Sequence, residues 1–248
     1  LTAVQNLTLT RISATAKGMA AIATMPALRD LMLERGNFGE EALEPLAKSQ
    51  VATLNLSQNR RLSARTPEIL ARIATLRRLD LTNTSVGGNL APLAGLPKLE
   101  ALEISQTFAD AADLAALAKA PALAQLNAND MPGIDDTGVT ALAASKTLNS
   151  IAITRTAVGD AGLAAILAVP TLRSIYADDL VVTDAFTAAG AKSKVINMQI
   201  GNSDLTDAGL AALVDIPSLT TVSLRGTRVT DAGIAAAKAK RPNFNVYK

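Results

Sequence analysis

Residues 229–237 read VTDAGIAAA, and closely similar phrases occur at 205–213 (LTDAGLAAL) and 158–166 (VGDAGLAAI). A catalytic motif is needed once in a chain. A phrase that returns along the sequence is instead typical of a structure built from repeated segments. The three phrases therefore predict a repeat architecture.

A second pattern, L-x-x-L-x-L, gives the period of the repeat. Its matches begin 23 to 25 residues apart, fill residues 4–243 with ten repeats, and leave a partial repeat that starts at Phe244. In each match the last two apolar residues alternate with other residues, which predicts a short strand with one buried side. The ten strands are expected to begin near Leu7, Leu31, Leu54, Leu79, Leu102, Leu126, Ile151, Ile175, Met198 and Val222.

This repeat resembles that of the leucine-rich repeat family, L-x-x-L-x-L-x-x-N-x-L at 20 to 29 residues. The resemblance implies an α/β fold, a leucine-rich repeat solenoid or horseshoe. Ten parallel strands would line its concave face, and short helices or 3₁₀ turns its convex face. Residues 1–248 would form a single domain of ten repeats, about 4–243, with a C-terminal cap at 244–248. A single repeat cannot bury its apolar side, whereas a stack of repeats shares one continuous core.

The Thr-Asp-Ala-Gly-Leu phrase is similar to bacterial leucine-rich repeats, including those of the GALA-type effectors that plant-pathogenic bacteria deliver into host cells. That similarity implies a bacterial protein that is secreted or exported. An F-box segment like that of those effectors is not visible in the sequence. We also expect residues upstream of LTAVQNL (1–7), because nothing in that stretch covers the first repeat.

The phrase itself predicts how each helix begins. Thr230 suits a helix N-cap, and Asp231 follows in the first turn, where its charge favours the helix dipole. Five aspartates share this register, which also suggests a calcium ladder, but metal ligands must converge on one point. We therefore expect capping and no metal site along this column: Asp136, Asp160, Asp184, Asp207 and Asp231.

Two other features of the convex side are predicted from single residues. Pro45 and Pro92 fall between inward-facing leucines, where a proline disfavours an α-helix, so short 3₁₀ turns or late-starting helices are expected there. In the last segment, RPNFNVYK (241–248), Phe244 and Tyr247 are expected to close the open end of the core.

The composition excludes several kinds of chemistry. The chain has no Cys and no His, so disulfides, zinc–thiolate sites and imidazole bases are absent. The formal net charge is only +2, which indicates no nucleic-acid partner. No apolar run approaches the ~20 residues of a membrane span. We expect no cofactor and no catalytic residue.

One pair of acids could mimic an active site. Asp80 and Glu103 occupy the same column on neighbouring predicted strands, about 4.8 Å apart, which suggests a glycosidase pair. No aromatic platform for a sugar accompanies them, so catalysis is disfavoured. Like charges opposite each other destabilise a sheet. Arg78 on the same strand, or a basic partner, is expected to offset them.

The concave face is the predicted binding surface, because solenoids present an extended curved face to their partners. Tyr176 is its expected aromatic anchor, with Arg155 and Asp179 close enough to pair beside it. The function predicted is a monomeric module that binds a protein partner. Two alternatives are the substrate-recognition arm of a larger enzyme, such as a ubiquitin-ligase-type effector, and a structural or cell-surface module. The candidate partner-binding residues are Met32, Asp80, Glu103, Asn127, Arg155, Tyr176, Asp178 and Gln199.

Overall fold

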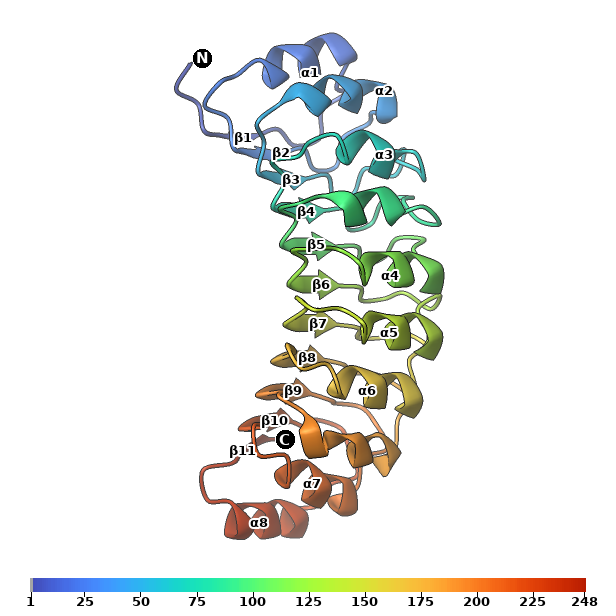
Figure 1. Ribbon diagram of the computed structural model, residues 1–248, viewed down its shortest axis with the longest axis vertical. Coiled ribbons are helices and arrows are strands. Elements are labelled where there is room, and N and C mark those ends of the chain that lie inside the picture. Colours follow the sequence, from blue (N-terminus) through green and yellow to red (C-terminus); the bar gives the residue numbers. More distant parts are fainter. Residues whose placement is uncertain (1) are drawn as a thin grey trace. The chain divides into compact units, whose positions relative to one another are not determined.

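A computed structural model describes residues 2–248, which contain eleven short parallel strands in chain order (Figure 1). Each strand is three residues long and is separated from the next by a helix or a 3₁₀ segment. The strands are β1 (Asn6–Thr8), β2 (Asp30–Met32), β3 (Thr53–Asn55), β4 (Arg78–Asp80), β5 (Ala101–Glu103), β6 (Gln125–Asn127), β7 (Ser150–Ala152), β8 (Ser174–Tyr176), β9 (Asn197–Gln199), β10 (Thr221–Ser223) and β11 (Asn245–Tyr247).

The chain divides into two compact parts, which we call the first half, up to Asn127, and the second half, from Ala128. The first half carries β1–β6 with α1 (Ala16–Ala23), α2 (Glu40–Leu43), η1 (Glu44–Lys48), α3 (Thr66–Leu70), η2 (Ala91–Gly95) and α4 (Ala111–Leu117). The second half carries β7–β11 with α5 (Asp136–Leu142), α6 (Asp160–Leu167), η3 (Asp184–Lys192), α7 (Asp207–Val214) and α8 (Asp231–Lys240).

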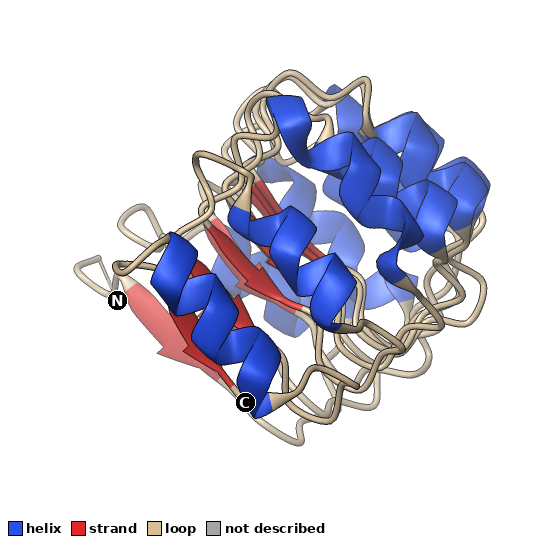
Figure 2. Cartoon of the chain, turned by 90° about the horizontal axis from the view of Figure 1, so that it is seen from below, coloured by secondary structure: helices blue, strands red, loops and turns tan. Residues whose placement is uncertain are grey.

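Within each half, the helices lie on one side of the strands, and loops join the two layers (Figure 2). The core between the layers is made of aliphatic side chains. In β3, for example, Leu54 and the following Leu56 are both fully buried, and Leu79 repeats this position in β4. The predicted strand positions are therefore confirmed, with each predicted residue at the centre of its strand.

A left-handed residue follows every strand from β1 to β10, always at the fourth position after the strand centre. Backbone φ lies between 51° at Asn202 and 61° at Gln58, and Gly226 has a φ of 72° in the last repeat. A non-glycine residue pays about 1 kcal/mol or more for this conformation. It recurs because the chain must turn sharply from the strand towards the helical side.

In several repeats the turn is held by the family's asparagine or by a hydroxyl side chain in its place. Asn59 keeps the asparagine, is fully buried, and donates from Nδ2 to the carbonyls of Leu33 (2.6 Å) and Leu56 (2.7 Å). In five other repeats a hydroxyl donates to the carbonyl three residues earlier, at 2.7 to 2.8 Å, and so satisfies a backbone group at the turn. These hydroxyls belong to Thr84, Thr107, Thr156, Ser203 and Thr227.

The helix starts confirm Thr230 as an N-cap, since its Oγ1 accepts from Gly233 N at 3.1 Å. The aspartates after these caps do not cap their own helices, contrary to the expectation for this column, but accept hydrogen bonds from the next repeat. Asp160 accepts from both N–H (2.9 Å) and Oγ1 (2.8 Å) of Thr183, the N-cap one repeat later. Asp184 and Asp207 bind Thr206 and Thr230 in the same way.

The glycine of the repeated phrase leaves room for these carboxylates. A Cβ at Gly209 would lie 2.2 Å from Asp184 Oδ1, and one at Gly233 would lie 2.1 Å from Asp207 Oδ1. The phrase Thr-Asp-Ala-Gly therefore combines three functions. The threonine caps the helix, and the aspartate accepts hydrogen bonds from the following repeat. The glycine leaves space for the aspartate of the preceding repeat.

The first half uses other acids for the same bonding. Glu40 takes the position of the aspartates and accepts from Ser63 N (2.6 Å) and Ser63 Oγ (2.7 Å). Asp113 works in the opposite direction, because it accepts from the N–H groups of Gly88 and Leu90 in the preceding repeat, each at 2.7 Å. Neighbouring repeats are thus tied by carboxylates on their helical side.

The prolines have the effect predicted from the sequence. Pro45 lies in η1 and Pro92 in η2, both 3₁₀ segments. A third 3₁₀ segment, η3, was not predicted; there Phe186 replaces the glycine of the phrase and is fully buried.

The C-terminal end differs from the prediction in two respects. An eleventh strand, β11, pairs in parallel with β10, so ten strands was one too few. Phe244 is buried as expected and lies under the Arg241 guanidinium, 5.3 Å from the ring centroid. Tyr247 does not close the core, because strand alternation turns it outward and leaves it 61% exposed, while Val246 faces inward.

Candidate partner-binding face

The side of the strands away from the helices carries the candidate site, and we call it the strand face. It consists of the first and third residues of each strand together with the residue two positions further on. Within the first half, the third residues align as Met32↔Asn55↔Asp80↔Glu103↔Asn127. Within the second half they align as Ala152↔Tyr176↔Gln199↔Ser223↔Tyr247.

In the first half, the strand face has a hollow of about 180 Å³. Met32, Asp80 and Glu103 line it, together with Arg78 and Gln125. The hollow therefore brings together three of the candidate residues that the sequence indicated. Asn127 lies beside it and donates from Nδ2 to both oxygens of Glu103, at 2.7 Å each.

Glu103 is the perturbed acid of this hollow. Burial raises its pKa, the amide of Asn127 lowers it, and the negative charge of Asp80 raises it, so that the pKa lies above the ordinary value. Asp80 is held by the N–H of Thr82, which donates to its Oδ1 at 2.8 Å. These two carboxylates form an acceptor-rich patch that favours a donor or a cation.

The expectation that Arg78 offsets the repulsion between Asp80 and Glu103 was wrong. Arg78 forms no ion pair with Asp80 or Glu103 in the part of the chain that the structure describes, and it is exposed. Arg78 and Asp80 are two residues apart and therefore share one face of the strand. Sharing a face does not bring the guanidinium and the carboxylate into contact. The acidic pair is left to solvent and to Asn127.

In the second half, a hollow of about 300 Å³ lies between the two tyrosines of the chain. Tyr176 on β8 and Tyr247 on β11 stand at its sides, and Gln199 and Ser223 lie between them in register. Tyr176 is 38% exposed, as its predicted place on the strand face requires, and its small neighbour Ala152 is buried.

A second hollow of about 350 Å³ lies where strands β7–β10 end. Arg155 lines it and confirms the expected pairing, since its Nη1 lies 3.5 Å from Asp179 Oδ2. Its closer partner is Asp130, with Nη2 and Oδ2 3.0 Å apart, and both aspartates raise the pKa of Arg155. Asp178 accepts from the N–H of Gly201 at 2.6 Å.

Two residues of this surface were missed by the sequence analysis. Tyr247 is one, because the register of the partial repeat, Phe-x-Val-Tyr, places it in line with Ser223 and away from the core. Arg225 also lines the strand-end hollow, and its position two residues after Ser223 was the available signal.

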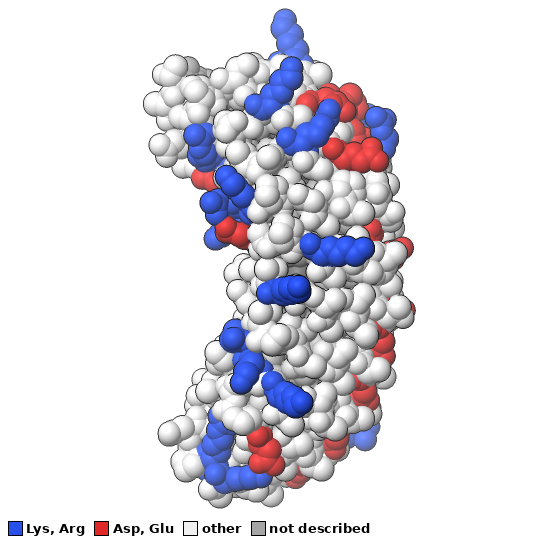
Figure 3. Space-filling model, viewed as in Figure 1, with Lys and Arg blue, Asp and Glu red and all other residues white. Residues whose placement is uncertain are grey.

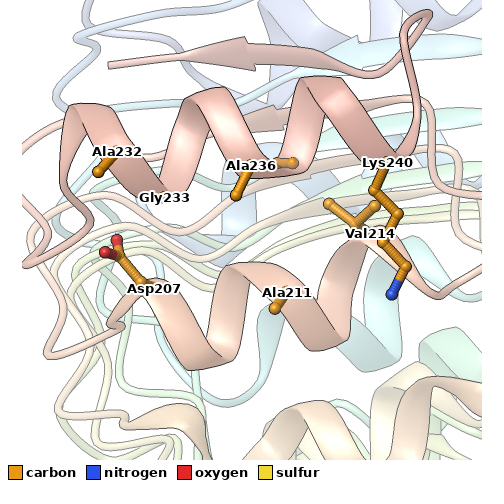
Figure 4. A pocket seen from close by; sticks show the side chains of 8 residues that line it. Asp207, Ala211, Val214, Ala232, Gly233, Ala236 and Lys240 are labelled. Atoms are coloured by element: carbon orange, nitrogen blue, oxygen red, sulfur yellow. The ribbon is translucent and has the colours of Figure 1, made fainter.

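A groove on the helical side is the main apolar alternative to the strand face as a binding site (Figure 4). It has a volume of about 330 Å³ and lies between α7 and α8. Ala211, Val214, Ala232 and Ala236 line it, with Lys240 at one end. Its walls offer small methyl groups and few polar contacts, in contrast to the hollows of the strand face.

The described residues place limits on other kinds of site. Among residues 2–248, no group of three or more acids, cysteines or histidines is arranged to hold a metal ion. No described helix combines the length and the apolar character that crossing a membrane requires. Basic side chains on the face seen in Figure 3 are dispersed in small groups among uncharged surface.

Parallel three-residue strands, one per repeat of 23 to 25 residues, define a solenoid protein of the leucine-rich repeat class. Residues 40–199 match the family described as "FBD-associated F-box protein At5g56370, LRR repeats". The match covers more than half of the chain, which therefore belongs to this leucine-rich repeat family. No curated protein shows significant sequence similarity to it.

Solved structures with the same fold differ widely in sequence. An internalin (InlF) from Listeria monocytogenes is 16% identical, with a TM-score of 0.56 over 98% of this chain and 86% of that one. Internalin C2 from the same species is 19% identical, with a TM-score of 0.53 over 89% and 78%. TLR13, solved in complex with ssRNA13, is 15% identical, with a TM-score of 0.66 over 88% and 31%.

Proposed function

We propose that this protein is an interaction module that binds a protein partner through its strand face. The observation that carries the proposal is the position of the hollows. Three of them open on the strand face, and seven of the eight candidate residues line them, while Asn127 is bonded to Glu103 at the edge of one. The eighth residue thus supports the same surface.

The side chains on this face suit binding better than catalysis. Tyrosine and arginine, which dominate binding energy at many interfaces, are present in the second half. The perturbed acid, Glu103, has another carboxylate and an amide as its neighbours. The lining of its hollow includes no aromatic residue on which a sugar could stack.

Residues 1–248 form one leucine-rich repeat domain in this proposal. The repeat phase supports this, because Leu126 and Ile151 on either side of the junction between the halves are 25 residues apart, within the normal period. The Thr-Asp-Ala-Gly-Leu phrase supports a bacterial, exported protein of effector type. We propose separately that the protein acts as a monomer.

Site-specific photo-crosslinking in cells that express the protein tests the proposal. A benzoylphenylalanine would replace Asn55 or Gln199 on the strand face and, as matched controls, exposed Lys119 beside α4 or Lys238 on α8. We expect the same partner protein to be crosslinked from both strand-face positions and from neither control. Crosslinks that form only from Lys119 and Lys238 would refute binding through the strand face.

A second candidate is the substrate-recognition arm of a larger, ubiquitin-ligase-type protein. The match to the repeats of an F-box protein favours it. The two candidates share the binding face and differ in the fate of the partner. Ubiquitylation of the crosslinked partner in cells, abolished by substitutions on the strand face, would support the second candidate, and an unmodified partner would support the first.

A further inference from the structure

The two hollows in the second half form one continuous surface. The hollow between the tyrosines and the hollow at the strand ends share Gln199 and Ser223 in their linings. A ligand that lies over β9 and β10 would therefore contact both (Figure 1).

The tyrosines set the width of this surface. Tyr176 and Tyr247 stand three strand spacings apart in register, which places their backbones about 14 Å from each other. Between them the floor is made of the shorter polar side chains of Asn197, Gln199 and Ser223. An extended polypeptide with its side chains is about 10 Å across, as the spacing of packed sheets shows, so it fits between the rings.

The charges set its polarity. Within the strand-end hollow, Arg155 pairs with Asp179 and more closely with Asp130, while Asp178 accepts from the N–H of Gly201 and forms no ion pair among the described residues. Arg225 is exposed and has no ion pair among the described residues. The hollow therefore offers one uncommitted cation, and a guanidinium binds a carboxylate with two parallel hydrogen bonds.

We propose that this surface binds an extended segment of the partner in which a bulky apolar residue is followed, two positions later, by Asp or Glu. The inference rests on the proposed function and specifies its partner. The apolar side chain lies between Tyr176 and Tyr247, and the carboxylate reaches Arg225.

The spacing of this motif follows from strand geometry. Arg225 follows Ser223, the last residue of β10, by two positions, a step of about 6.6 Å in extended chain, and both residues line the same hollow. A partner segment that runs along the strands advances by the same length in two residues and points both side chains the same way. Gly201 lies between Asp178 and Arg225 in repeat register, and its N–H is taken by the Asp178 carboxylate, so Arg225 is the group left to bind the partner's carboxylate.

Selection from a phage-displayed library of random nonapeptides against the whole chain tests the motif. We expect enriched peptides to carry an aromatic or large aliphatic residue two positions before Asp or Glu. Fluorescence polarisation of the best labelled peptide then measures affinity. Tyr176→Ala, Tyr247→Ala and Arg225→Glu should each weaken binding at least ~10-fold. Selection on Arg225→Glu should shift the acidic position to Lys or Arg.

Matched controls separate the site from general surface effects. Val181→Ala removes another exposed apolar side chain of the second half, and Lys238→Glu reverses another exposed charge. Both should leave affinity within twofold of the wild type. Circular dichroism confirms that each variant is folded.

The outcomes distinguish the two proposals. If the selected peptides lose binding only on Asp80→Asn or Glu103→Gln, the motif proposed here is overturned and binding through the strand face stands. If no substitution on the strand face affects binding, or if no peptide is enriched against folded protein, the motif is again overturned. The crosslinking experiment then decides the proposed function independently.

Discussion

The carboxylate of Asp207 accepts two hydrogen bonds from Thr230, one from its N–H at 2.7 Å and one from its Oγ1 at 2.7 Å. These bonds join α7 to the N-cap of α8, 23 residues further along the chain. They lower the pKa of Asp207 below its ordinary value. Asp231 occupies the same position one repeat later but binds only Lys248, at 3.1 Å, and its side chain is 96% exposed.

This difference predicts unequal effects for the same substitution. Asp207→Ala removes the bonds between repeats, whereas Asp231→Ala removes an exposed ion pair of little value. Both residues are first in their helices, so the loss of favourable charge at the helix start is common to both. We expect Asp207→Ala to have a clearly lower melting temperature than the wild type. The melting temperature of Asp231→Ala should be almost unchanged. Equal melting temperatures would show that the bonds do not stabilise the stack.

The glycines of the repeated phrase permit a second matched comparison. Gly18 and Gly209 are both the third residue of their helices. A Cβ at Gly209 would collide with Asp184 Oδ1 at 2.2 Å, whereas at Gly18 the nearest atom, Thr15 Oγ1, is 3.6 Å away. Gly18→Ala should stabilise the fold by ~0.5–1 kcal/mol, and Gly209→Ala should destabilise it by ~1–3 kcal/mol. Urea unfolding of both variants measures the two signs, and a stabilised Gly209→Ala would contradict the packing described here.

Two glutamates of the first half should affect stability with opposite signs. Burial raises the pKa of Glu40, but hydrogen bonds from Ser63 and Thr66 outweigh it and leave the pKa lowered. Its stabilising contribution is therefore present above the unfolded pKa and is lost as pH falls through the folded pKa. The pKa of Glu103 is raised, so its charged form costs stability at neutral pH, and the cost disappears as pH falls.

We expect Glu40→Gln to be less stable than the wild type at pH 7 and Glu103→Gln to be more stable. Each difference should stay within ~1 kcal/mol, because both carboxylates are partly exposed to screening solvent. The Glu40 difference should shrink as pH falls below the ordinary glutamate pKa of about 4.3, whereas the Glu103 difference should already shrink above that value, as pH falls through the raised pKa. Thermal unfolding between pH 3 and pH 7 provides the test, and differences of the same sign would contradict the hydrogen bonding of Glu40.

The cap at the C-terminal end should depend on Phe244. Its ring is buried and covered by Arg241, so Phe244→Ala should cost about 3–5 kcal/mol. Phe108 is 73% exposed, and Phe108→Ala should change stability by no more than about 0.5 kcal/mol. Removal of residues 241–248 should lower the melting temperature as well. Chemical denaturation that finds Phe244→Ala no less stable than Phe108→Ala would refute the cap.

The sequence by itself determined the strands, the period and the side of each strand that is buried. These features depend on residues near each other in the chain, such as Leu54 and Leu56, whose alternation leaves one possible inward face. It also placed Tyr176, Asp80 and Glu103 in their columns, because a constant period carries the register from repeat to repeat. Even the interruption of the α-helix at Pro92 followed from one residue and its missing N–H.

The tertiary structure decided which polar groups meet. The bonds from Thr230 to Asp207 cross from one repeat to the next, and the sequence shows only that both residues recur. The partners of Arg155 and the failure of Arg78 to reach Asp80 depend on side-chain directions that alternation does not fix. The exposure of Tyr247 was likewise decided by the pairing of β11, because a partial repeat gains its inward and outward sides only when it stacks on β10.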